Sequence, residues 1–498
     1  MTISYSVARN GSTTCSYNGR ALHSRYNPEH EAELFVQTLS VSFRPRAVVV
    51  IEPALSYCAP FLRSRFPDAC LCAIRVQAAL TESDGSWDIV FSLSSPEKKT
   101  ELAHTLYNHF GEETLSACLS LAWTPAAHAF PELTSAAWSA LLAATEKSRT
   151  VLYTRSYFAS RWLSNAVRYI QSTTTTVGVT PGDTPVVVIA SGPSLTGILP
   201  LLKKMRQRYF LLAVSSALAP CSTYGIVPDM CIATDGGWWA RRHFDRMPVS
   251  QMVMALPPEA VYPATQWNDT QLLPLAYGDS LIDTLLHSCG YTPHRAERNG
   301  TVSGTAMALA CGLTAGPVFL CGLDLAPAAG FQHAQPNALE CIHRATDGRL
   351  MPKEMRIMRT RFSGAASLAL YHDWFSAVPP EITARIYRLR DDHTASAPLG
   401  AIRDTDVSFF CHTVRTGGKQ MPHITACPPL PDKKTRAARI ATFIATAAHT
   451  AAWQKEFFPL ETVSENRALT ETDAAQMHAL FIERNKKLCA RLQRLISQ

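Results

Sequence analysis

Seven short apolar runs in the middle of the sequence constrain the fold more than any other feature. They lie at residues 186–190, 210–215, 230–234, 252–256, 272–276, 318–322 and 385–389. Continuous apolar runs of this length are typical of strands that are covered on both faces. Helical patterns, such as that at 302–313, separate many of the runs. This alternation predicts an α/β fold with a doubly wound, mostly parallel sheet.

The length of the chain implies more than one domain. A chain of 498 residues is too long for a single hydrophobic core, and we expect roughly two to four domains. Residues 1–150 predict a smaller α/β domain, residues 151–427 the domain of the large sheet, and residues 428–498 a helical C-terminal domain.

Local patterns support this division. In the first region, Asn27 and Pro28 form a typical helix start, and strands expected at 47–51 and 70–76 give a βαβ pattern. The threonine- and glycine-containing stretch 173–182 is expected to be a linker into the large sheet. The tail from residue 470 predicts a helix that begins with a capping box and packs through one apolar face.

Composition narrows the class of partner. The formal net charge is +7 and no long run of Lys or Arg occurs, which suits an anionic small molecule better than a nucleic acid. The 14 cysteines form no C-x-x-C pairs, so we expect reduced, buried thiols and no metal site. The N-terminus lacks an apolar signal core, and no apolar run approaches the roughly 20 residues of a membrane span. We therefore expect a soluble, cytoplasmic protein without membrane insertion.

The residues that follow each strand are the first candidates for a site, because ligands of such sheets bind outside the carboxyl ends of the strands. After the first run come Ser191, Gly192, Pro193 and Ser194, which form a tight corner before a helix. The helix N-terminus would offer N–H groups and a positive dipole end to an anion. The corner lacks the lysine of a P-loop and the three glycines of a dinucleotide fingerprint. A purely structural corner remains the alternative.

Two further strand ends carry polar groups. Asp235 follows the third run beside two glycines, where it could bind a ribose hydroxyl or simply order the loop. Ser303 and Gly304 begin the helix at 302–313, and small residues with hydroxyls at a helix start favour an anion or a ribose. An ordinary capped helix, packed closely through Gly304, is the alternative reading of that segment.

The run at 318–322 is followed by Asp324 and, shortly afterwards, by His333, and both titratable residues are candidates for catalysis. A histidine near the carboxyl edge of a sheet can act as a general base on a hydroxyl. A lone histidine is more often structural, however, and His343, His372 and His393 compete with His333 for this role.

Taken in order, these motifs resemble the motility-associated factor (Maf) glycosyltransferases, which modify flagellin. The resemblance spans about residues 21–399. It rests on the G-P-S-L corner, on Asp229 and Asp235, on the small-residue helix start, and on G-L-D-L-A with a histidine after it. It also rests on residues 22–32, which look like the family signature H-S-x-Y-x-P-x-x-E-A, and on R-W-L-S-N at 161–165.

The resemblance implies a Rossmann-like central domain similar to that of bacterial sialyltransferases. It implies that Ser191, Gly192, Pro193 and Ser194 contact the phosphate of a CMP-activated sugar, and that Ser303 and Gly304 contact its CMP portion. The donor would be a nonulosonic acid such as pseudaminic or legionaminic acid, and the acceptors would be Ser or Thr hydroxyls of flagellin. No tightly bound cofactor and no metal are implied. His333 matches the family histidine and would be the base.

The sequence departs from the family at several positions. Leu323 stands where glutamine is usual, Ser191 stands where alanine or asparagine is common, and residues 389–396 replace an N-A-T-E-G-G-A stretch. The last change leaves open a different sugar or a loss of activity.

Two other functions remain open. Hydroxymethylpterin diphosphokinases share the corner and the strand-end aspartate, but they need further carboxylates for Mg²⁺, and Asp235 is followed by Gly-Gly-Trp-Trp. A non-catalytic flagellin-binding chaperone on the same fold is the second alternative.

Overall fold

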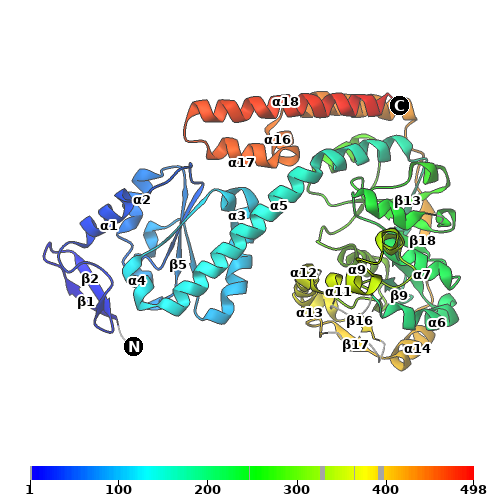
Figure 1. The fold of residues 1–498 in the computed structure, drawn as a ribbon, viewed down its shortest axis with the longest axis horizontal. Helices are drawn as coiled ribbons and strands as arrows, with labels where there is room; N and C mark the ends of the chain where they lie inside the picture. The colour runs from blue at the N-terminus through cyan, green and yellow to red at the C-terminus, as the bar shows by residue number, and fades with distance from the viewer. Residues whose placement is uncertain (1–2, 246, 326–330, 364, 391–396, 498) are drawn as a thin grey trace. The chain divides into compact units, whose positions relative to one another are not determined.

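The computed structural model describes residues 3–245, 247–325, 331–363, 365–390 and 397–497 (Figure 1). The described chain forms two compact units. Unit 1 contains the residues up to 159 together with 448–488, and unit 2 contains 160–447 together with 489–498. The first division falls inside the long helix α5 (Pro131–Ser172). The helical region after residue 428, expected as a separate domain, is thus shared between the two units.

Unit 2 is built on one large sheet. In sequence order, its eleven described strands are β8 (Thr175–Thr180), β9 (Val186–Ile189), β10 (Phe210–Val214), β11 (Met230–Ile232), β12 (Val253–Leu256), β13 (Gln271–Ala276), β14 (His294–Arg295), β15 (Val318–Cys321), β16 (Ile386–Leu389), β17 (Arg403–Thr405) and β18 (His423–Ala426). All seven predicted runs form strands, and every strand pair is parallel except that of β18 with β8. The α/β class and the mostly parallel sheet are therefore confirmed.

The predicted linker at 173–182 is wrong in its central part. Residues Thr175–Thr180 form strand β8, which pairs with β13 on one side and with β18 on the other. The threonines and valines of this segment suit a pleated strand because their branched Cβ atoms pack well there. Gly178 lies where Thr425 of the neighbouring strand passes, 3.4 Å from the position that a Cβ would take. Pairing on both sides therefore overrides the linker-like composition.

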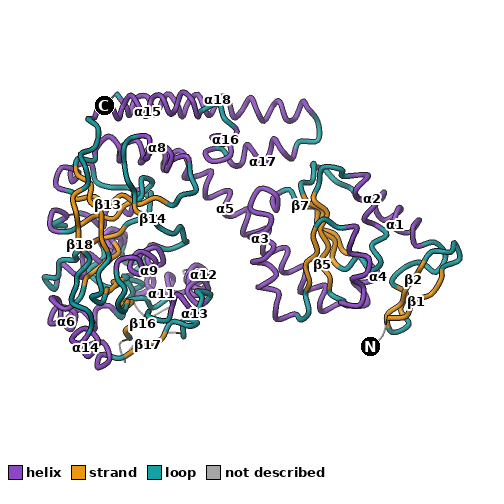
Figure 2. Tube along the Cα trace, turned by 180° about the vertical axis from the view of Figure 1, so that it is seen from behind, coloured by secondary structure: helices purple, strands orange, loops and turns teal. Residues whose placement is uncertain are grey.

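The strand order defines a switch point. The strand order is β17-β16-β15-β9-β10-β11-β12-β13-β8-β18, so β9 lies between β10 and β15. Helix α6 (Leu195–Met205) precedes β10 in the chain, and helix α9 (Val302–Leu313) precedes β15. Right-handed crossovers in opposite directions put their helices on opposite faces of a sheet. Helices α6 and α7 (Leu218–Thr223) accordingly cover one face and α9 the other (Figures 1 and 2).

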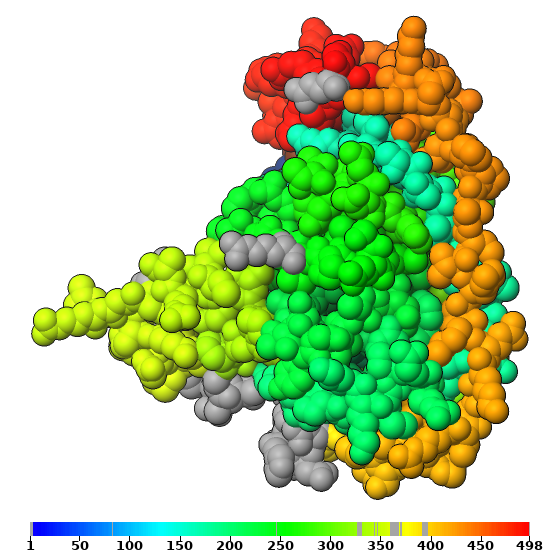
Figure 3. Space-filling model, turned by 90° about the vertical axis from the view of Figure 1, so that its right-hand side faces the viewer, coloured from blue at the N-terminus to red at the C-terminus, as the bar shows by residue number. Residues whose placement is uncertain are grey.

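The other α-helices that lie wholly within unit 2 are α8 (Leu281–Ser288), α10 (Ala338–His343), α11 (Lys353–Ser363), α12 (Ala365–Ser376), α13 (Pro380–Thr383), α14 (Val407–Thr416) and α15 (Lys433–Ala447). Helices α10 to α13 form an insertion between β15 and β16. In the space-filling view this insertion (yellow-green) projects beside the segments that carry β9 to β13 (green) (Figure 3). The insertion follows directly on the segment that contains His333.

Unit 1 contains a smaller parallel sheet with its own core. Its strands are β4 (Ala47–Ile51), β5 (Cys70–Arg75), β6 (Ile89–Ser92) and β7 (Cys118–Ala122), in the order β6-β5-β4-β7. An antiparallel sheet of β1 (Ile3–Val7), β2 (Thr13–Tyr17) and β3 (Arg20–Ala21) lies in the same unit. The βαβ pattern expected from the sequence is confirmed, and all five residues of β4 are buried.

The helices of unit 1 are α1 (Pro28–Gln37), α2 (Cys58–Arg65), α3 (Lys99–Ser116), α4 (Thr124–Ala129), α16 (Ala451–Phe457), α17 (Pro459–Arg467) and parts of α5 and α18 (Glu471–Ile496). The predicted cap of α1 is confirmed, because the Asn27 side chain accepts a hydrogen bond from the His30 amide. The capping box of α18 is present as well: Thr470 Oγ1 accepts from the Asp473 amide at 3.1 Å. No helix in the described ranges is both long and apolar enough to cross a membrane.

Candidate active site

The corner after β9 faces the end of β15 at the switch point. The Ser194 amide donates a 2.9 Å hydrogen bond to Asp324 Oδ2, and the Ser194 hydroxyl donates to Oδ1 of the same carboxylate. The Gly192 amide donates to Gly322 O at 2.7 Å. Two segments 130 residues apart in sequence are therefore joined at the carboxyl edge, as the strand-end rule anticipates. Ser194 and Asp324 are both buried.

Gly192 is required by this close approach. A Cβ on Gly192 would lie 2.4 Å from Gly322 O and 2.5 Å from Asp324 Oδ2. Gly322 has φ of +67°, and a Cβ there would lie 2.6 Å from Ala190 O. Both glycines thus allow the backbones after β9 and β15 to touch, which no residue with a side chain permits without a shift.

The Asp324 carboxylate occupies the position that an anion would take at the start of α6. The Ser194 amide donates to Asp324, the Leu195 amide to Gly192 O at 3.1 Å, and the Thr196 amide to Pro193 O at 3.3 Å. An external phosphate would have to displace the aspartate to use the helix N-terminus. Ser194, expected to contact a phosphate, thus has an internal acceptor in the structure.

The start of α9 offers a second set of donors. Thr301 caps this helix and accepts a 2.9 Å hydrogen bond from the Gly304 amide through its hydroxyl. A Cβ on Gly304 would lie 2.6 Å from the Asn299 side chain, so the glycine allows Asn299 to fold over the helix start. The Val302 and Ser303 amides donate to no acceptor among the residues that the structure describes.

His333 lies against the corner after β9. The amide of the next residue, Ala334, donates a 2.8 Å hydrogen bond to Ser191 O. The Ser191 hydroxyl accepts a 2.8 Å hydrogen bond from Ser216, which follows β10. Burial lowers the pKa of His333 below its usual value. The imidazole is therefore neutral at neutral pH and able to accept a proton.

A second histidine, His243, stands near His333. It belongs to the 3₁₀ helix Trp238–Phe244. The pKa of His243 is lowered to about 4, mainly by burial and to a smaller extent by the nearby His333, while Asp235 opposes both effects. His243 therefore interacts electrostatically with both His333 and Asp235 beside the strand ends.

Asp235 both orders its loop and remains exposed. Its Oδ1 accepts a 2.6 Å hydrogen bond from the Gly237 amide, while the residue as a whole is solvent-accessible. Helix α5 supports the same loop, because Asn165 Nδ2 donates to Glu259 O at 2.9 Å and to Gly236 O at 3.3 Å. Asn165 of the motif at 161–165 therefore holds the loops after β11 and β12. Asp229 precedes β11, at the opposite end of the strand.

A charged cluster after β12, β13 and β14 was missed by sequence reasoning. Arg298 lies 3.0 Å from Glu259 and 3.4 Å from Asp279, and its guanidinium sits 4.0 Å from the centre of the Tyr277 ring. Glu259 is buried, and burial raises its pKa although Arg298 opposes the shift. The Arg298 side chain is 41% exposed, so it can present its charge to a ligand.

The strand-end rule could have found most of the missed residues. Ser216, Glu259 and Asp279 each follow a predicted strand by one to three positions. His243 lies further from its strand, and no sequence signal distinguished it. Of the competing histidines, His372 has its Nε2 2.9 Å from Pro398 O, and His393 lies outside the described residues, as do residues 391–396 of the altered family stretch.

The arrangement combines neutral imidazoles, hydroxyls, a carboxylate, open helix amides and an arginine at one sheet edge. These groups can remove a proton from a hydroxyl, bind sugar hydroxyls and neutralise a leaving phosphate. Among the described side chains, no three of His, Cys, Asp and Glu are grouped as ligands for a metal ion.

Comparisons with known proteins found a matching family, a relative and a similar solved structure. Residues 160–329 match the family "6-hydroxymethylpterin diphosphokinase MptE-like". An uncharacterized protein of Treponema pallidum (strain Nichols) is 29% identical over 320 residues, which are 63% of this chain and 70% of that protein.

The structure of a Maf glycosyltransferase from Magnetospirillum magneticum AMB-1 has a TM-score of 0.51 to this chain. The sequences are 12% identical, and the match covers 100% of this chain and 90% of the other. At this identity the likeness shows a shared fold. The chain therefore has a glycosyltransferase-like α/β fold, whose matched family region ends soon after Asp324.

Proposed function

We propose that the protein is a glycosyltransferase that moves a nonulosonic acid from a CMP-sugar to Ser or Thr hydroxyls of flagellin, and so serves flagellar assembly and motility. The observation that carries the proposal is that His333, His243 and Asp235 interact electrostatically beside the strand ends of a glycosyltransferase-like fold. The ordered motifs of the sequence support the same reaction class.

In the proposed reaction, neutral His333 removes the proton of the acceptor hydroxyl. The hydroxyl oxygen bonds to the anomeric carbon of the sugar while the bond from that carbon to the phosphate oxygen breaks. CMP leaves with the electron pair of the broken bond. Because burial lowers the pKa of His333, the base is unprotonated at neutral pH without help from a carboxylate.

The remaining groups bind the donor. The Val302, Ser303 and Gly304 segment at the start of α9 holds the phosphate, since its first amides are open and the corner after β9 already holds Asp324. Asp235 accepts from a hydroxyl of the nucleotide or sugar. Arg298 pairs with the carboxylate of the sugar acid, because its guanidinium is exposed at the same sheet edge.

Intact-mass spectrometry of flagellin tests this proposal. Purified flagellin is incubated with the protein and a CMP-nonulosonic acid, and its mass should increase by whole sugar residues. His333→Ala should lower the initial rate by roughly a hundredfold or more, as expected for loss of a general base. His372→Ala is the matched control and should retain full activity. Full glycosylation by His333→Ala would show that His333 is not the base.

The family match favours one alternative, a pterin diphosphokinase-like activity. In that case the protein would bind ATP with Mg²⁺ and form a pterin diphosphate, with no effect on flagellin mass. If the protein instead binds flagellin but neither substrate is converted, the non-catalytic chaperone reading replaces both enzymes.

A further inference from the structure

Unit 1 has a switch point of its own. In its sheet, β5 and β6 lie on one side of β4, while β7 lies on the other. All three pairings are parallel, so the carboxyl ends of β4 and β7 are neighbours at the same edge. This is the position at which open α/β sheets bind ligands. The proposed transferase site does not use this edge.

The loop after β4 is strained. Glu52, Ala54 and Ser56 have φ of +43°, +49° and +62°, although none of them is glycine. The buried Arg75 holds all three in place: it donates to Glu52 Oε1 at 2.8 Å, to Ala54 O at 2.7 Å and to Ser56 Oγ at 2.9 Å. Strain of this kind persists where surrounding structure enforces it, and it clusters at ligand sites.

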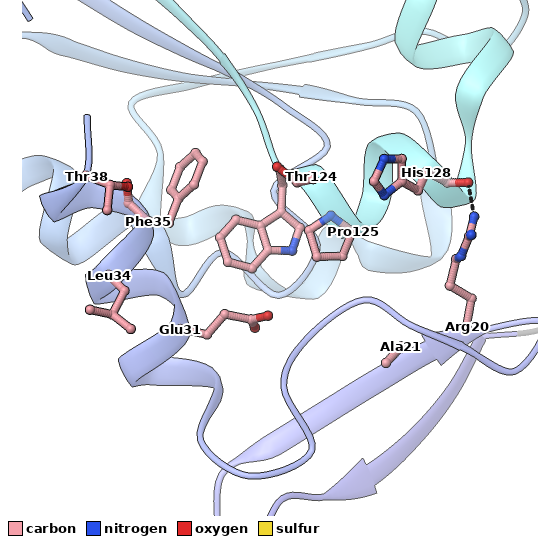
Figure 4. A pocket seen from close by; sticks show the side chains of 10 residues that line it. Arg20, Ala21, Glu31, Leu34, Phe35, Thr38, Thr124, Pro125 and His128 are labelled. Atoms are coloured by element: carbon pink, nitrogen blue, oxygen red, sulfur yellow. Dashed lines mark hydrogen bonds between the residues drawn. The ribbon is translucent and has the colours of Figure 1, made fainter. Parts of the chain in front are cut away.

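A cavity of about 490 Å³ lies beside the end of β7 (Figure 4). Trp123 and Pro125, which follow β7, form one wall, and Glu31, Leu34 and Phe35 of α1 form the other. The Phe35 and Trp123 rings lie edge to face with centroids 5.1 Å apart. These two walls are therefore mainly aromatic and aliphatic, with one carboxylate.

The strained loop and the cavity share a buried histidine. The Leu55 amide donates a 2.9 Å hydrogen bond to His23 Nε2, and the His23 ring lies 5.0 Å from the Trp123 ring. His23 Nδ1 lies 3.6 Å from Glu31 Oε2, which also accepts a 2.7 Å hydrogen bond from the Ser24 amide. Glu31 Oε1 accepts no hydrogen bond from the residues that the structure describes. One oxygen of the carboxylate is thus fixed and the other is available.

We infer that this cavity binds a guanidinium or ammonium group carried on an aliphatic stem. The Glu31 carboxylate supplies the counter-charge and disfavours phosphates and other anions. The Trp123 and Phe35 rings attract a cation. Leu34 packs against the stem, as apolar surface does for lysine and arginine side chains.

Two other titratable groups line the cavity, Arg20 and His128. The Arg20 guanidinium donates a hydrogen bond to the backbone carbonyl of His128. In Figure 4, Arg20 and His128 lie at the right of the picture, whereas Leu34 and Thr38 lie at the left. The cation site is therefore the Glu31 end of the cavity.

Ligand-observed NMR titrations of the full-length protein test the inference. The probe is N-acetyl-L-arginine methylamide, and its neutral isostere, N-acetyl-L-citrulline methylamide, should bind at least about tenfold more weakly. Free agmatine is a third probe: tighter binding of the capped arginine indicates a polypeptide ligand, and tighter binding of agmatine indicates a small amine. Equal binding of the arginine and citrulline probes would overturn the inference.

Variants of α1 complete the test. Glu31→Gln keeps the shape of the side chain and should weaken the arginine probe about tenfold, whereas Glu33→Gln on the same helix should not. Leu34 is 45% exposed, so Leu34→Asp should leave folding unchanged, and its added charge should tighten the probe. If Glu31→Gln does not fold, the Leu34→Asp result decides alone, and an unchanged or weaker affinity there contradicts the site. Flagellin glycosylation is not involved in these readouts.

Discussion

Gly192→Ala tests whether the corner after β9 is built on direct backbone contact with the end of β15. The new methyl carbon would lie 2.4 Å from Gly322 O, and 2.5 Å and 2.9 Å from two atoms of the Asp324 carboxylate. Ordinary contacts need about 3.5 Å. The two segments must therefore separate by roughly 1 Å, because the nearest atom belongs to backbone and cannot rotate away.

The expected loss follows from what this separation breaks. Overpacking of a tight site costs about 1–3 kcal/mol. The hydrogen bond from the Ser194 amide to the Asp324 carboxylate would also weaken, at about 1.5–3 kcal/mol for a charged acceptor. Since these contributions overlap, we expect unit 2 to lose about 3–4 kcal/mol of unfolding free energy. That loss corresponds to a melting temperature lower by roughly 5–10 °C.

Differential scanning calorimetry measures this shift. Gly348→Ala is the matched control in unit 2, because a Cβ there meets no atom within 4 Å, and it should change the melting temperature by no more than about 1–2 °C. Equal melting temperatures for the two variants would refute the contact. The double variant Gly192→Ala/Asp324→Ala should lose less unfolding free energy than the sum of the two single losses, because both changes disturb the same contact.

Two further predictions concern the same site. Asp324→Ala leaves the Ser194 amide and hydroxyl without their acceptor, so the variant should be less stable than the wild type. Inorganic phosphate should nevertheless raise its melting temperature more than that of the wild type, because the anion can replace the lost carboxylate. Equal effects of phosphate on the two melting temperatures would show that no anion position exists at the start of α6. His243 has a pKa lowered to about 4, whereas a histidine of the unfolded chain titrates near 6.5. Between these values the unfolded chain binds the extra proton, so the stability is complete above about pH 6.5 and falls, by up to about 3 kcal/mol, as the pH drops towards 4. Urea unfolding at pH 7 and pH 4.5 should show this loss in the wild type and a smaller one in His243→Gln; identical pH dependence would contradict the burial of His243.

Much of the fold was predictable because strands of a buried parallel sheet have continuous apolar sequences. Strand β9 and its neighbours ended within two residues of the predicted limits. Strand β8 was not recognised, since its mixture of threonines and valines, interrupted by Gly178, is equally typical of a linker. Short polar strands such as Arg403–Thr405 carry no apolar signal at all.

The candidate site was predictable in position but not in internal pairing. The rule for strand ends brought Ser194 and Asp324 to one edge, yet nothing in the sequence states that the carboxylate turns inward to the Ser194 amide. His243 depends on the path of the loop after β11, which is set by Asn165 of α5 and by packing at Gly236. Such contacts between distant segments are determined by tertiary structure rather than by local pattern.

Isothermal titration with CMP tests most directly the central claim, a cytidine-nucleotide site at the start of α9. Val302→Pro removes one open amide while keeping the helix, because proline suits the first helical position and Thr301 before it is already extended, with φ of −136° and ψ of 146°. We predict that CMP binds the wild type, that Val302→Pro weakens it about tenfold or more, and that ATP with Mg²⁺ does not bind. Binding of ATP with Mg²⁺ in place of CMP, or equal CMP affinity in the two proteins, would contradict the account.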